Sequence, residues 1–249
     1  MQVTVQTIID SAIDLADMRN SAFIGQLDNT LGTTDGGTKE LLRYVNMAYR
    51  DLYQQIIQSK EFFFNTSYTI NIVGGTTSYS LPSDFYKVNG VDLQIDVSSQ
   101  RYLTLKPMQF LERNKFRSGL VIPLAPYGQF FRYLIQNTLS NPTIEFLPMP
   151  SNAATVIVWY TPEPVQITLF SQTLTLPPGG DEYMSLYCAC AMLAKEESDN
   201  TALDMKRQQV IEQLLGSLKD PDQGSASFVV DESSINMGSI YPGLFGGDW

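Results

Sequence analysis

The chain has 249 residues, of which 43% are hydrophobic and 17% are charged, and its net charge is −10. This length and hydrophobic content allow one large or two modest globular domains. The low charged fraction suggests that part of the surface is buried against partners. Non-specific DNA binding depends on Lys and Arg that displace counterions. An acidic chain whose densest basic pair is Lys206-Arg207, beside Asp204 and Glu212, is therefore not expected to bind DNA tightly.

The two cysteines, Cys188 and Cys190, stand two residues apart on an expected helix. They point to different faces and do not form a disulfide with each other, a usage that suits a reducing cytosol. The N-terminus lacks the basic and apolar regions of a signal peptide. No apolar run approaches the roughly 18 residues that a membrane helix needs. We expect a protein that is made in a cytoplasm.

The first part of the chain has the apolar spacing of two helices. The first is expected to start near Thr4, and the turn-forming residues 28–37 make a loop. Thr38 is expected to cap the second helix, with Glu40 in its first turn. The apolar stripe of the second helix consists of Leu41, Val45, Ala48, Tyr49, Leu52 and Ile56.

The period changes from helical to alternating near Phe62. Strands are expected at residues 67–72, 78–81, 91–97, 127–136, 143–147 and 154–160. A short helix is expected over residues 107–117, with Pro107 at its first position. Turns at Asn141-Pro142 and at 148–150 separate the later strands.

Helical spacing returns after residues 177–180, Pro-Pro-Gly-Gly, and gives two more helices before Pro221. Two helix pairs that each show one apolar side are best buried against each other, as a four-helix bundle. The expected fold class is thus α+β. It has a helical bundle from residues 1–61 and 177–221, an inserted antiparallel β-domain over 62–176, and an extended C-terminal tail over 222–249.

Groups that carry catalysis are scarce in this sequence. The absence of His removes the commonest general base and most catalytic zinc sites. The spacing of Cys188 and Cys190 fits neither a zinc site nor a redox motif, so both are read as small core residues. No glycine doublet lies in a phosphate-binding motif. We expect no catalytic residue, no metal site and no cofactor.

Acidic pairs and aromatic clusters could in principle indicate a glycosidase site or a ligand-binding site. Asp181-Glu182 and Glu196-Glu197 are adjacent on expected helices and diverge, so neither pair can flank a sugar. Asp14 and Asp17 are expected to share a solvated helix face. The clusters at residues 62–64 and at Phe130-Phe131 favour a core or a subunit contact over a ligand site.

Several local phrases, in this order, resemble one family. They are residues 44–49 (Tyr-Val-Asn-Met-Ala-Tyr), 79–86 (Tyr-Ser-Leu-Pro-Ser-Asp-Phe-Tyr), 147–150 (Leu-Pro-Met-Pro) leading into the 154–160 strand, 160–164 (Tyr-Thr-Pro-Glu-Pro), and the helix pair from 177 to 218. The chain resembles the head-to-tail connector, or adaptor, proteins of tailed phages, especially the tail tubular protein A type. The resemblance covers nearly the whole chain.

The resemblance implies a structural virion protein of the neck, at the head-tail junction, and no enzyme. It implies a dodecameric ring of this chain beneath the portal protein, joined to a tail nozzle or another tail protein. DNA would pass through the lumen without specific binding, and no membrane would be involved. Two other classes remain open: a tail-associated carbohydrate- or protein-binding module, and a cell-wall hydrolase that uses carboxylates alone.

The tail over 222–249 has no periodic pattern and no Lys or Arg. Its large side chains are of the type that dominates binding hot spots. The expected docking residues are Phe228, Ile240, Tyr241, Leu244, Phe245 and Trp249. The tail would dock on the portal or on a neighbouring subunit, as the resemblance suggests; folding back on its own helices and staying disordered are the alternatives.

Overall fold

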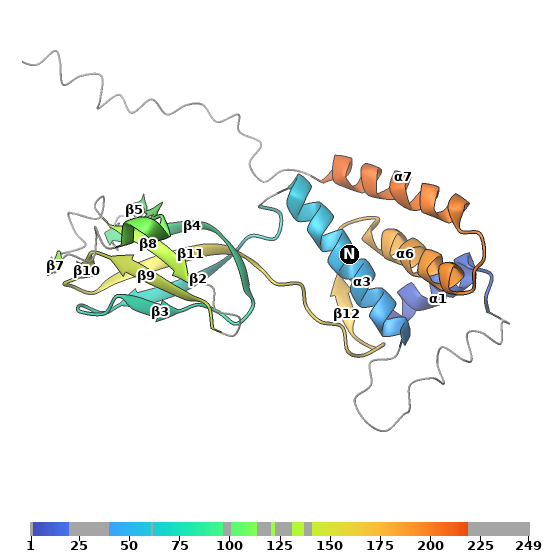
Figure 1. Ribbon diagram of the computed structural model, residues 1–249, viewed down its shortest axis with the longest axis horizontal. Coiled ribbons are helices and arrows are strands. Elements are labelled where there is room, and N and C mark those ends of the chain that lie inside the picture. The colour runs from blue at the N-terminus through green and yellow to red at the C-terminus, as the bar shows by residue number, and fades with distance from the viewer. Residues whose placement is uncertain are drawn as a thin grey trace, which may run out of the picture. The chain divides into compact units, whose positions relative to one another are not determined.

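Helices occupy both ends of the described chain, and strands occupy its middle (Figure 1). The computed structural model describes residues 2–19, 40–60, 62–96, 101–113, 121–122, 131–136 and 141–218. Within these residues the protein is a mixed α+β structure with four α-helices and several mainly antiparallel sheets. The helices are α1 (Val5–Leu15), α3 (Glu40–Ser59), α6 (Gly180–Lys195) and α7 (Thr201–Ser217). No helix in these ranges is long and apolar enough to cross a membrane.

Local sequence signals set where α1 and α6 begin. The side chain of Thr4 accepts a hydrogen bond from the Thr7 N–H, which confirms the predicted start of α1. Gly179 precedes α6 with a φ of 84°, a left-handed conformation that suits glycine. Asp181 and Glu182 lie in the first turn of α6, where the helix dipole favours negative charge. Thr38, the expected cap of α3, lies outside the described residues.

Residues from all four helices form one hydrophobic core. Helix α6 packs against α1, α3 and α7. Because it contacts all three of the other helices, Tyr183, Leu186 and Met192 are buried. Strands β1 (Gln2–Thr4) and β12 (Thr173–Thr175) pair antiparallel beside these helices and add Val3 and Leu174 to the same core. Neither strand was predicted from the sequence.

The remaining strands form two four-stranded sheets and a small two-stranded one. The first sheet has the order β2 (Thr66–Ile72), β11 (Ala154–Pro162), β4 (Phe85–Asp96) and β5 (Arg101–Thr104). The second has the order β3 (Ser78–Ser80), β9 (Thr143–Leu147), β8 (Arg132–Gln136) and β6 (Lys106–Pro107). The small sheet pairs β7 (Val121–Ile122) with β10 (Met149–Pro150).

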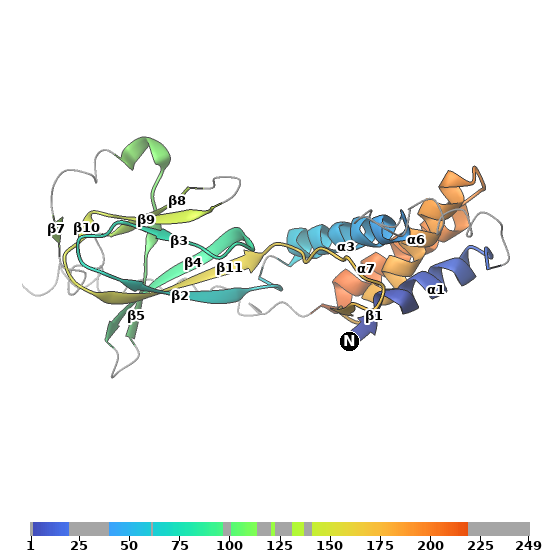
Figure 2. The same ribbon diagram turned by 90° about the horizontal axis from the view of Figure 1, so that it is seen from below.

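The two four-stranded sheets stack face to face and share a second core (Figure 2). In the first sheet, alternate residues point inward, so Ile70, Val156 and Leu93 are buried side by side in register. Ile144 and Phe146 of β9 enter the same core from the second sheet. The strong alternation in the sequence was thus a reliable signal for β2, β4, β9 and β11.

One predicted element is wrong. Pro107 does not begin a helix, because it belongs to β6 and pairs with Tyr133 of β8. The helical turn that follows is short, a 3-10 helix at Phe110–Glu112. Proline suits the first turn of a helix and also the edge of a sheet, and local sequence does not separate these two uses. The expected strand at 127–136 starts at Arg132 among the described residues.

Candidate functional site

The described residues contain no metal-binding cluster, and both cysteines are buried. No group of three His, Cys, Asp or Glu side chains in the described residues could hold a metal ion. Cys188 and Cys190 are free thiols and are buried, as the sequence predicted for core residues. Burial raises the pKa of Cys188 to about 12, with a smaller contribution from Cys190. A thiol with that pKa stays protonated near neutral pH and is a poor nucleophile.

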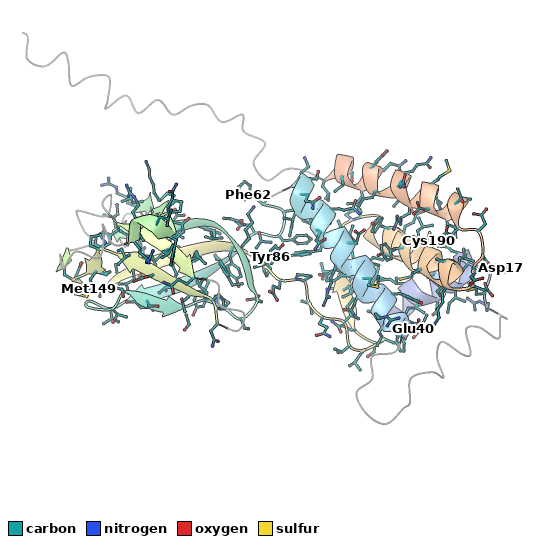
Figure 3. All side chains as sticks on the ribbon, viewed as in Figure 1. Asp17, Glu40, Phe62, Tyr86, Met149 and Cys190 are labelled. Carbon is teal, nitrogen blue, oxygen red and sulfur yellow. The ribbon has the colours of Figure 1, made fainter. Side chains whose placement is uncertain are left out.

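In each acidic pair considered as a possible site in the sequence, at least one carboxylate lies beyond the helix or bonds to a basic side chain. Asp14 lies on α1, whereas Asp17 lies beyond its end with a φ of 53°, so the expected shared helix face is wrong (Figure 3). A hydrogen bond from Arg19 lowers the pKa of Asp14. Glu197 also lies past the end of its helix, with a φ of 58°, so Glu196-Glu197 is not a helical pair. On α6, Glu182 pairs with Lys206 of α7 at 3.0 Å.

A polar bridge links α3 to the segment that returns from the sheets. The side-chain amide of Asn46 donates to the Ile167 carbonyl at 2.8 Å and accepts from the Ile167 N–H at 2.9 Å. Ile167 is fully buried, so these bonds satisfy backbone groups that water cannot reach. Asn46 belongs to the 44–49 phrase on which the family resemblance rests. Its role in the fold is to hold a segment 121 residues away.

A second polar cluster joins α3 to α6. The Tyr183 hydroxyl donates to Asp51. The Gln55 amide donates to the Tyr183 hydroxyl at 2.8 Å and to Asp51 at 2.8 Å. Burial and the Asp51 hydrogen bond raise the pKa of Tyr183. The cluster sits between helices that also share apolar contacts, so it fixes how one helix is rotated against the other.

Glu40 makes a third link, from the start of α3 to the end of α6. Lys195 donates to its carboxylate at 2.6 Å, and the Tyr44 hydroxyl donates to it at 2.9 Å. The hydrogen bond from Lys195 lowers the pKa of Glu40. Burial and the bond to Glu40 raise the pKa of Tyr44 to about 12. These groups are therefore paired with one another across the two helices.

Aromatic side chains gather where α3 meets the first sheet. Tyr53 stacks on Phe64 with ring centroids 4.2 Å apart, and Phe63 meets Phe64 edge to face at 5.0 Å. The Tyr53 hydroxyl donates to the Pro162 carbonyl at the end of β11, at 2.5 Å. Phe63 and Phe64 pack against the helical core, which favours the core interpretation of the 62–64 cluster. In Figure 3, Phe62 and Tyr86 are labelled in the same region.

An open groove of about 680 Å³ lies beside these rings. Its walls combine the rings with prolines and with two exposed carboxylates. They are formed by Tyr49, Tyr53, Phe63, Phe64, Ser83, Asp84, Pro162, Glu163, Pro164, Val165, Gln166, Thr175, Leu176 and Pro177. None of these residues is a Lys or Arg, so the described wall combines apolar rings and prolines with negative charge.

The sequence did not reveal this groove, because its walls come from four separate parts of the chain. Phe131, from the other aromatic cluster, is fully buried in the core of the two sheets, and Phe130 lies outside the described residues. The expected docking residues of the tail also lie outside them. These are Phe228, Ile240, Tyr241, Leu244, Phe245 and Trp249.

Comparison with known families matches residues 3–231 to the SU10 adaptor protein family. The match covers both the helices and the sheets described above. It supports an adaptor and structural role in a phage virion, in agreement with the resemblance noted in the sequence. No curated protein matches the chain.

Proposed function

Since the chain belongs to the SU10 adaptor protein family, we propose that it builds the adaptor ring between the portal and the tail of a tailed phage. In this role it links capsid to tail and lets DNA pass. The ring is a dodecamer of the tail tubular protein A type, with the portal protein on one side and a nozzle or another tail protein on the other. The observation that carries this proposal is the family match over residues 3–231.

Within the ring, the helices act as a four-helix bundle from residues 1–61 and 177–221, and residues 62–176 form an inserted β-domain. The polar links at Glu40 and Tyr183 support this division, because each joins residues 1–61 to residues 177–221. Residues 222–249 serve as the docking tail. A chain with this division can hold one half in a ring and present the other to a partner.

The distribution of charge supports passage of DNA without tight binding. Several described Lys and Arg side chains already pair with carboxylates, and they are Arg19, Arg43, Lys195, Lys206 and Arg207. With a net charge of −10, the chain as a whole repels the phosphate backbone, and tight DNA binding needs a surplus of Lys and Arg that displace counterions. A lumen with an acidic or neutral wall would let DNA slide.

The test is the state of assembly of the full chain, alone and mixed with the cognate portal. Light scattering after size-exclusion chromatography gives the mass, and electron microscopy of stained particles gives the symmetry. The proposal requires closed rings, alone or on the portal. A monomer that neither assembles nor binds the portal contradicts it.

The aromatic groove favours a second candidate, a tail-associated binding module. Open aromatic walls with a few polar groups are found at carbohydrate and protein sites alike. Binding of a glycan by a stable monomer on a glycan array, lost on Phe63→Ala, would favour this function over the ring. For the carboxylate-only hydrolase, the expected activity is clearing of a peptidoglycan suspension. The acidic pairs considered in the sequence do not favour it, because Asp17 and Glu197 lie beyond their helices and Glu182 pairs with Lys206.

A further inference from the structure

The first four-stranded sheet ends at β2, and one side of this strand is open. Over Thr66–Ile72, β2 pairs with β11. In the described part of the chain no strand pairs on its other side. The first four residues of β2 are exposed. The edge of a sheet presents a row of backbone N–H and C=O groups, which is a template for another strand.

Proteins usually protect such edges with charge, proline, bulges or shortness, and here the other edges are protected. Strand β5 has four residues, begins with Arg101 and pairs through an irregular register near Asp96. Strand β3 has three residues, and β6 consists of Lys106 and Pro107. In contrast, β2 has seven residues, with no charge and no proline. It is the long unprotected edge among the strands of the two sheets.

The core next to this edge is incomplete. Tyr68 points to the same side as Ile70 and Ile72, because alternate residues of a strand share a face. Its exposed fraction is 40%, against 5% and 1% for these two neighbours. A large apolar side chain from an added strand would cover the Tyr68 ring as a cross-strand pair and extend the buried core to this edge of the sheet.

We infer that β2 receives residues 225–230 from the C-terminal segment of a second copy, as a fifth strand. This inference rests on the proposed function, since a ring places a second copy beside each chain. The segment, Ser-Ala-Ser-Phe-Val-Val, is uncharged, and Phe228, Val229 and Val230 are residue types that strands favour. The family match extends beyond α7 to residue 231 and thus includes this segment.

Electrostatic repulsion between two acidic copies favours contact between their uncharged segments. Two copies of a chain with a net charge of −10 repel each other on average, so they meet most favourably where neither side is charged. Both β2 and residues 225–230 meet this condition. Main-chain hydrogen bonds would supply affinity, and contact with the exposed Tyr68 ring would supply the register.

The first test is a disulfide between copies of the full chain. Thr69→Cys is combined with Val229→Cys or, separately, with Val230→Cys, because adjacent strand residues face opposite sides. The native Cys188 and Cys190 are buried and remain outside the reaction. Mild oxidation is expected to give a ladder of linked chains beyond a dimer for one of the two combinations. Ser78→Cys on β3, combined in the same way, is the control and is expected to give none.

The second test places a protective charge on the edge. Thr69→Lys is expected to weaken assembly at least about tenfold, whereas Ser78→Lys on the exposed, short β3 leaves it unchanged. Circular dichroism with an unchanged Tm shows that both variants fold. Links within one chain, no ladder, or wild-type assembly by Thr69→Lys would overturn the inference while the ring stands. Failure of the wild-type chain to assemble even on the portal would instead overturn the proposed function.

Discussion

The side-chain amide of Asn46 pairs with the backbone of Ile167 as a neighbouring strand would: it donates to the Ile167 carbonyl and accepts from the Ile167 N–H. Its amide makes a further bond to the Leu42 carbonyl one turn earlier in α3, at 2.8 Å. One side chain thus ties the middle of a helix to a buried extended segment. This use explains why an Asn stands on the core side of a helix whose buried residues are all aliphatic or aromatic.

Asn46→Ala is expected to lower the free energy of unfolding by about 2 to 4 kcal/mol, because it leaves the buried N–H and C=O of Ile167 without partners. Urea denaturation followed by circular dichroism measures the change. Gln208→Ala on α7 is the control, since it removes an exposed amide whose bond to Asp204 is 3.4 Å long, and is expected to change stability by less than about 0.5 kcal/mol. Equal effects of the two substitutions would contradict the role given to Asn46.

Tyr183→Phe is expected to cost about 1 to 3 kcal/mol of stability, since Asp51 and Gln55 lose a common partner between α3 and α6. Tyr187→Phe removes the same group from the same helix, at a half-buried ring that lies under Arg207. It is therefore a matched control with a smaller expected effect. Thermal unfolding of both variants decides; a larger loss for Tyr187→Phe would show that the cluster does not stabilise the helix pair.

Alkaline pH is expected to destabilise the protein through its buried thiol. In the unfolded chain a cysteine ionises near pH 8.5, whereas burial raises the pKa of Cys188 to about 12 in the folded protein. The stability tied to this group is complete below the unfolded pKa and is lost as pH rises from about 8.5 towards 12. Cys188→Ala should flatten the dependence of unfolding free energy on pH in this window. An unchanged slope would show that the thiol does not contribute.

Local patterns in the sequence predicted much of the fold. The alternation in 91–97 led to β4, and the polar residue at Thr4 marked the start of α1, because both depend on the residues themselves. Strands β1 and β12 have three residues each and were not predicted, because a segment of three residues is too short to show a periodic pattern. These strands pair with each other, Gln2–Thr4 with Thr173–Thr175, and no local window of sequence contains both.

The candidate site was harder to predict for the same reason. The family phrase at 44–49 pointed to Asn46 but not to its partner at Ile167, and the aromatic residues at 62–64 pointed to a core but not to a groove. Asp17 was placed on a helix because the spacing of three from Asp14 fits one face. The positive φ at Asp17 is a property of the turn that ends α1 and has no strong local signal.

The full chain is expected to bind duplex DNA weakly even at low salt. Its net charge is −10, and Arg43, Lys195 and Lys206 are among the cations already paired with carboxylates. Filter binding at about 20 mM salt, where protein–DNA attraction is strongest, measures this. A matched control is the chain with Glu163→Lys and Asp84→Lys, which creates a basic groove rim and should raise binding. Tight binding by the wild type that falls steeply with salt would contradict a sliding role.

The last prediction concerns deletion of residues 222–249. The chain divides into separate units after Leu218, so the truncated protein keeps the unit that contains both cores. It should therefore remain folded, with a Tm within about 2 °C of the full chain. It should fail to join the assembled particle, because the tail supplies the large apolar residues that anchor a docked segment. Thermal unfolding and incorporation into particles are measured on the same preparation.

A full-length variant separates the anchors from the length of the tail. It carries Ser in place of Phe228, Ile240, Tyr241, Leu244, Phe245 and Trp249. If these side chains dock, this variant behaves like the deletion, folded but absent from particles. If it joins particles normally, the anchors are not the docking residues. Unfolding of the truncated protein would place the tail in the chain's own core, because only burial there would make the helices and sheets depend on it.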